Sequence, residues 1–176
     1  MKVKTAVIDD LMPLYNFYDE VIEHQKQDEY GAGWTKDVYP SLEDLKEKIE
    51  NDLFFIGTDQ DHIVCAAALS LQEDIQYKKG KWLRKLDDGE IGVLHLFAVH
   101  PDCRGKGVSQ GFLKQILLEA EKHVKSIHLD LVKGNLAALK AYEKAGFRCV
   151  GQIEVFYEDT GNILVELMEY DFENRI

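Results

Sequence analysis

The chain has 176 residues, enough to bury a substantial apolar core, and we expect residues 1–176 to form a single domain. Its formal net charge of −11 argues against non-specific nucleic-acid binding, and no apolar run approaches the ~20 residues of a membrane span. The N-terminus lacks a signal pattern, so a cytoplasmic protein without membrane or nucleic-acid partners is expected. No C-x-x-C pair or ligand-spaced His, Asp and Glu set is present, so no metal site is predicted.

The N-terminal part of the chain predicts a strand over 2–8 and then a helix whose apolar stripe runs over 11–22. The segment 25–40 breaks this helical pattern. Its large rings, Trp34 and Tyr39, would be costly to expose to water. The segment therefore either packs against the core or walls a binding pocket, with Trp34 and Tyr39 as candidate substrate-binding residues.

The next part of the chain predicts a helix and a hairpin. A capping-box pattern at 41–44 begins the helix, and the strands 53–58 and 63–71 follow, joined by a short polar turn. Residues 72–90 are rich in charge and predict a loop or an extension of the second strand. At the start of that segment, Glu73 and Asp74 are candidate ligands for a cationic amine.

A strand, a tight loop and a helix lie in the middle of the chain. Residues 91–100 are apolar on both faces, which indicates a covered central strand, and Pro101 ends it. Because side chains alternate along a strand, we expect His95 and Phe97 to share a face. The following helix has an apolar stripe over 108–124.

The loop between that strand and that helix predicts a phosphate site. A helix start leaves backbone N–H groups unpaired and positively polarised, and glycines let other atoms approach them. The cations of Arg104 and Lys106 add to this attraction for an anion. The loop fits neither the Walker pattern nor the dinucleotide fingerprint, because Gly107 follows the lysine and Gly111 comes one place late.

The remaining segments complete the predicted order β-α-α-β-β-β-α-β-α-β-β. They are a strand over 126–132, a helix over 135–145 and two strands over 147–157 and 163–170, joined by a turn at 158–162.

Two motifs resemble the GNAT superfamily of acyl-CoA-dependent N-acetyltransferases. Arg104, Gly107 and Ser109 occupy the three defining places of its signature R/Q-x-x-G-x-G/A, with serine in place of the usual glycine or alanine. The second motif, N-x-x-A-x-x-x-Y-x-x-x-G-F, comprises Asn135, Ala138, Tyr142, Gly146 and Phe147. The resemblance covers about residues 90–150. It implies an α/β (α+β) chain with the GNAT fold, a mixed central sheet of about seven strands flanked by about four helices.

The resemblance also implies acetyl-CoA as the cofactor. Its diphosphate would lie on the 104–109 loop, and its pantetheine arm would run along the strand edge at 97–99, where the neighbouring strands splay apart. The implied cofactor-binding residues are Phe97, Ala98, Val99, Arg104, Gly105, Lys106, Gly107, Val108, Ser109, Asn135, Ala138, Tyr142 and Lys144.

Acetyl transfer to an amine needs a base, a donor to the oxyanion and an acid for the leaving sulfur. The donor would be the amide of Phe97 or a neighbour, and Tyr142 matches the family's general acid, unless its ring serves only for packing. His95 is the candidate base and a candidate substrate ligand, unless it is a core histidine. Glu90, Glu73 and a water chain are its alternatives.

The leading hypothesis is therefore transfer of an acetyl group from acetyl-CoA to a primary amine of a small molecule, by direct attack. Acetylation of proteins or peptides is an alternative, and a non-catalytic CoA-binding regulatory module is another. A homodimer is possible.

Overall fold

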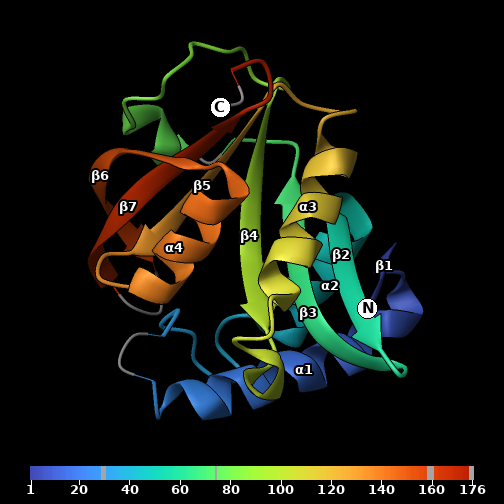
Figure 1. Cartoon of the computed structure of the whole chain (residues 1–176). Coiled ribbons are helices and arrows are strands. Elements are labelled where there is room, and N and C mark those ends of the chain that lie inside the picture. The colour runs from blue at the N-terminus through green and yellow to red at the C-terminus, as the bar shows by residue number, and fades with distance from the viewer. Residues whose placement is uncertain (29–30, 74, 158–160, 175–176) are drawn as a thin grey trace.

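A seven-stranded mixed sheet forms the centre of the molecule, with helices on both faces (Figure 1). The computed structural model describes residues 1–28, 31–73, 75–157 and 161–174. Its strands are β1 Lys2–Thr5, β2 Leu53–Asp59, β3 His62–Ser70, β4 Ile91–Val99, β5 Ser126–Val132, β6 Arg148–Tyr157 and β7 Gly161–Asp171. Its α-helices are α1 Leu11–Gln25, α2 Leu42–Asn51, α3 Val108–Ala120 and α4 Leu136–Ala145. The expected element order and fold class are confirmed.

The strands lie in the order β1-β2-β3-β4-β5-β7-β6, and β4 and β5 are the parallel pair among antiparallel neighbours. Most element boundaries follow the sequence pattern. The first strand ends earlier than predicted, because a 3-10 turn over Ile8–Asp10 leads into α1. Of the predicted final turn, residues 158–160 lie outside the described residues.

Two apolar clusters hold the helices to the sheet. Helices α3 and α4 pack on one face, where Phe112, Leu113 and Tyr142 join side chains of the strands. Helices α1 and α2 pack on the other face, where Leu14 and Leu45 are fully buried. Both clusters arise from stripes of apolar residues at helical spacing.

The capping box predicted at the start of α2 is present. The Ser41 hydroxyl accepts a hydrogen bond from the Asp44 amide at 3.1 Å, and the Asp44 carboxylate accepts one from the Ser41 amide at 2.8 Å. This reciprocal pair fixes where α2 begins.

A β-bulge interrupts β4 near its middle. His95 pairs with Ala68 and Ala98 with Ala66, so two residues of β4 face one of β3. Leu96 carries the irregularity, with φ of 54°, and its carbonyl accepts a 2.6 Å hydrogen bond from the Tyr18 hydroxyl of α1.

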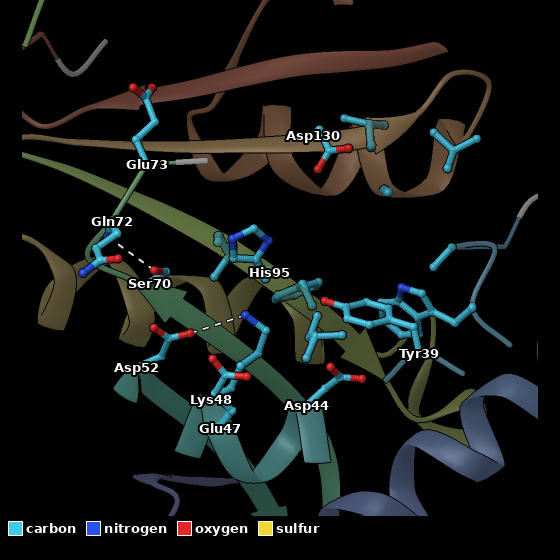
Figure 2. Close-up of a pocket in the computed structure, with 18 of the residues that line it drawn as sticks. Tyr39, Asp44, Glu47, Lys48, Asp52, Ser70, Gln72, Glu73, His95 and Asp130 are labelled. Atoms are coloured by element: carbon cyan, nitrogen blue, oxygen red, sulfur yellow. Dashed lines mark hydrogen bonds and ion pairs between the residues drawn. The ribbon is translucent and has the colours of Figure 1, made fainter. Parts of the chain in front are cut away.

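The bulge places His95 and Phe97 on opposite faces. Leu96 packs in the cluster under α1 and α2, whereas Phe97 packs against the cluster under α3 and α4. The imidazole of His95 lies on the α2 side, near Lys48 (Figure 2). The expectation that His95 and Phe97 share a face is wrong, because the extra residue shifts the alternation by one.

Strands β4 and β5 separate after Val93, just before the bulge. Their register runs from Ile91↔Ser126 to Val93↔His128 and stops there, although each strand continues. The splay expected for a cofactor arm is therefore present, and it opens the cavity that holds the candidate site.

Candidate active site

A cavity of about 1000 Å³ lies in the gap between β4 and β5 and continues to α2 and the segment after α1. Its described lining includes Trp34, Tyr39, Glu73, His95, Phe97, Asn135, Ala138 and Tyr142. These candidates come from distant parts of the sequence. The splayed strands and the helices on either side bring them to one space (Figure 2).

Tyr142 lies on α4 with 7% of its surface exposed. Its ring contacts Phe97 and Phe147, with centroids 5.6 and 5.5 Å away. Within the described residues its hydroxyl makes no hydrogen bond, and burial raises its pKa above the usual value of 10. The phenol is therefore protonated at neutral pH and free to donate a proton into the cavity.

His95 also lines the cavity, and its ring has no hydrogen-bond partner in the part of the chain that the structure describes. Burial, and secondarily the charge of Lys48, lowers the pKa of His95 from 6.5 to about 3. The imidazole is neutral at pH 7 and can accept a hydrogen bond. It is also a weaker base than imidazole in water.

Asn135 begins α4 at the edge of the cavity. Its side-chain oxygen accepts a 3.1 Å hydrogen bond from the amide of Ala138, so two residues of the second motif form a helix cap. This cap holds the start of α4, and with it the cavity wall, at the mouth of the β4–β5 gap.

The start of α3 fits a phosphate group. Gly107 caps the helix with φ of 77°, no side-chain oxygen bonds the first turn, and that turn has no acidic residue. A Cβ atom at Gly105 or Gly107 would meet no atom within 4 Å, so this surface is open to a ligand. Unpaired amides on an open, positively polarised helix end are suited to the diphosphate of a nucleotide cofactor.

The two cations of this loop differ in their surroundings. Arg104 is bound by Asp28 of the segment after α1, at 2.7 Å, and its guanidinium lies 3.5 Å from the ring of His24. Lys106 makes no ion pair with any described residue. A phosphate arriving at this loop therefore competes with Asp28 for Arg104.

Three residues predicted from the sequence to act in the site either lie outside the main cavity or are bonded to another side chain. Glu90 lies at the foot of β4, outside the cavity, and pairs with Lys125. Lys144, in the last turn of α4, lines a separate small cavity beside Gly146. Glu73 reaches the main cavity, but its carboxylate is hydrogen-bonded to His128 at 3.0 Å. Asp74 lies outside the described residues.

The buried group of side chains around His128 was not predicted from the sequence. His128 is 1% exposed and stacks on Trp82 with ring centroids 3.5 Å apart. The indole also donates a hydrogen bond to the carbonyl of Tyr77. Trp82 therefore packs against the protein itself, and its contacts hold residues 75–90 against the sheet.

The polar side of α2 was also missed. Asp44, Glu47, Lys48 and Asn51 line the cavity together with Asp52 just beyond the helix. Their spacing of three and four residues puts them on one helix face, which in sequence looks like any solvated face. Only the fold shows that this face lies opposite His95 (Figure 2).

Comparisons with known proteins agree with this geometry. Residues 17–147 match the model of the acetyltransferase (GNAT) family. No curated protein sequence matches the chain. In its described part no helix has both the length and the apolar character to cross a membrane, and no group of three His, Cys, Asp or Glu could hold a metal ion.

Several solved structures share the fold. A GNAT-family acetyltransferase from Streptococcus agalactiae has a TM-score of 0.79 at 19% identity, covering 98% of this chain and 96% of that one. A ribosomal-protein-alanine N-acetyltransferase from Brucella melitensis has a TM-score of 0.73 at 17% identity, with 98% and 100% covered. The protein yncA from Salmonella typhimurium, solved with its cofactor acetyl-CoA, has a TM-score of 0.70 at 15% identity, with 97% and 92% covered.

Proposed function

The chain belongs to the GNAT family of acetyltransferases, whose cofactor is acetyl-CoA, and we propose that it acetylates a primary amine of a small molecule. The observation that carries this proposal is that one continuous cavity of about 1000 Å³ joins the β4–β5 gap to the polar face of α2. One end suits the acetyl donor and the other an acceptor. Trp34 and Tyr39 bound the acceptor end, which favours a small molecule over a protein chain.

The residues around the gap fit acetyl-CoA. The open amides at the start of α3 would hold its diphosphate, with Lys106 and, after release from Asp28, Arg104. The edge of β4 at Phe97, where β5 has departed, would bind the pantetheine arm by backbone hydrogen bonds. When bound, acetyl-CoA supplies the acetyl group as a thioester with a good leaving group.

The β4 bulge supplies a backbone donor. A peptide unit is planar and trans, so the Phe97 N–H points opposite to the Leu96 carbonyl, which is engaged by Tyr18. We assign this N–H to the acetyl carbonyl oxygen. One such donor contributes about 2.7–4 kcal/mol of transition-state stabilisation in enzymes of acyl transfer.

Two side chains donate or accept protons in the proposed reaction. The Tyr142 hydroxyl holds a proton at Oη for the departing sulfur. His95 accepts a hydrogen bond from the neutral amine and passes the released proton to solvent, because its pKa of about 3 disfavours a lasting imidazolium. Glu90 has no part in this proposal, since it lies outside the cavity.

Release of free CoA thiol tests the proposal. Acetyl-CoA is incubated with the protein and a panel of small amines, amino acids, aminoglycosides and peptides with free N-termini. Thiol release with small amines and not with peptides is the expected result. The reverse pattern would assign the activity to proteins, and tight acetyl-CoA binding without thiol release from any amine would indicate a non-catalytic module.

A further inference from the structure

Helix α2 divides its surface between the core and the cavity. Leu45 is fully buried and Ile49 packs beside it against the sheet. The adjacent face, which carries Asp44, Glu47 and Lys48, lines the cavity below His95 (Figure 2). A helix face that would ordinarily be solvated thus forms the wall of the acceptor end.

This wall has an excess of negative charge. It holds the carboxylates of Asp44, Glu47 and Asp52 and one cation, Lys48, which pairs with Asp52 at 3.4 Å. Three negative charges and one positive charge leave a net charge of −2 on this wall. The other two carboxylates of the lining are engaged on the opposite side, Glu73 by His128 and Asp130 by Tyr77.

Of the three carboxylates on this wall, that of Glu47 has the fewest interactions with described residues. Asp44 serves the capping box, and Asp52 pairs with Lys48. The carboxylate of Glu47 makes no hydrogen bond or ion pair within the described residues, and only its backbone carbonyl accepts a hydrogen bond from a side chain, that of Asn51 at 3.0 Å. Its side chain is exposed at the cavity wall, and no cation of the described chain pairs with it, so this negative charge is available to a protonated amine in the cavity.

Two further observations indicate a ligand in the same space. The rings of Trp34 and Tyr39 border it, and aromatic faces attract ammonium groups. At the reacting end, Tyr142 is 93% buried, yet its hydroxyl lacks a partner in the described chain. The cavity therefore has a hydroxyl without a hydrogen-bond partner in the described chain at its reacting end and a site suited to a cation at its other end.

We propose that the acceptor is an aliphatic diamine or polyamine. One amine, in its neutral form, lies between His95 and Tyr142, and a second, protonated amine lies against Glu47 and Asp44. This inference rests on the proposed function and adds the class of acceptor. An acceptor with a carboxylate in place of the second amine fits less well, because Lys48 is already engaged by Asp52.

The transfer is balanced in atoms and charge. The amine nitrogen forms a bond to the acetyl carbon as the bond from that carbon to sulfur breaks. The proton lost by nitrogen passes by way of His95 to solvent, and the sulfur takes the proton of Tyr142, which solvent replaces. The products are the mono-acetylated diamine and free CoA thiol.

The test compares 1,4-diaminobutane, n-butylamine and 4-aminobutanoate as acceptors for the wild type, Glu47→Gln and Glu50→Gln. Glu50 is the matched control, since it lies on α2 and is exposed like Glu47 but does not line the cavity. We expect the diamine to have the highest kcat/KM. Glu47→Gln should lower kcat/KM for the diamine about tenfold and leave n-butylamine within about twofold, since tenfold corresponds to about 1.4 kcal/mol. Glu50→Gln should match the wild type.

Equal kcat/KM for diamine and monoamine, a preference for 4-aminobutanoate, or an equal loss for all acceptors in Glu47→Gln overturns the inference. Calorimetric titration of 1,4-diaminobutane into the same three proteins separates it from the proposed function. If no amine releases thiol, the proposed function fails. The diamine-binding site at Glu47 then stands without the transfer reaction if the diamine binds the wild type and binds Glu47→Gln more weakly, and it falls if no diamine binding is detected.

Discussion

Replacing Tyr142 by Phe removes one hydroxyl from the cavity and leaves the ring in place. The ring is 7% exposed and packs between Phe97 and Phe147, contacts that phenylalanine retains. The hydroxyl makes no hydrogen bond with a described residue, so its removal breaks none of the bonds seen here. We therefore expect the free energy of unfolding to change by less than about 0.5 kcal/mol, whereas Tyr142→Ala should cost about 3–5 kcal/mol.

The effect on catalysis should be much larger. Loss of a positioned general acid lowers kcat by about 100-fold or more, which corresponds to about 2.7 kcal/mol or more in the barrier. Because burial raises the Tyr142 pKa above 10, the wild-type enzyme should keep this donor protonated through mildly alkaline pH. The large kcat difference between the two proteins should therefore persist from pH 7 to pH 9.

The assay is thiol release at saturating acetyl-CoA and acceptor, with urea denaturation of both proteins as the stability control. A kcat for Tyr142→Phe within threefold of the wild type would refute the assignment of Tyr142 as the acid. The tyrosine would then serve for packing alone, which is the alternative that the sequence left open.

Two other predictions concern His95 and Arg104. The pKa of His95 is about 3 in the folded chain and 6.5 in the unfolded chain. As the pH falls below 6.5, the unfolded chain takes up a proton at His95 that the folded chain does not, so the folded state loses stability. Between pH 6.5 and 4.5 the free energy of unfolding of the wild type should fall by about 1–2 kcal/mol more than that of His95→Gln, a figure reduced for the partial exposure of His95. Urea denaturation measures both values. Parallel plots of the free energy of unfolding against pH for the two proteins would contradict this. Asp28→Asn should free Arg104 and tighten acetyl-CoA binding by about two- to fivefold in calorimetry, since exposed ion pairs contribute about 0.2–1 kcal/mol. Glu20→Gln, which alters the hydrogen bond between Glu20 of α1 and His100, is the control. An unchanged or weaker affinity in Asp28→Asn would show that the Asp28–Arg104 pair does not compete with the cofactor.

Local signals in the sequence were sufficient for most of the fold. The capping box at Ser41, the two-residue turn at Gln60 and Asp61, and the left-handed Gly146 after α4 each depend on a few adjacent residues. Apolar periodicity located the strands and helices for the same reason. The loop to which we assign phosphate binding could also be located, because the residues that suggest this role are six in a row.

The parts of the site that depend on distant contacts could not be predicted in this way. The bulge needs Leu96 at positive φ, which its side chain does not favour, and the hydrogen bond from Tyr18 that accompanies it comes from 78 residues earlier. Nothing near Arg104 in the sequence indicates Asp28 as its partner. The charge pattern of α2 does not reveal whether its polar face meets water or a ligand.

The hydrogen bond from Tyr18 to Leu96 ties α1 to the peptide unit whose N–H we assign to the acetyl carbonyl oxygen, although the tyrosine itself is outside the cavity lining. Rotation of that one peptide unit would turn its amide hydrogen away from the thioester without altering any side chain of the pocket. Changes in the packing of the first helix are therefore a route by which turnover could be tuned while acceptor choice stays the same.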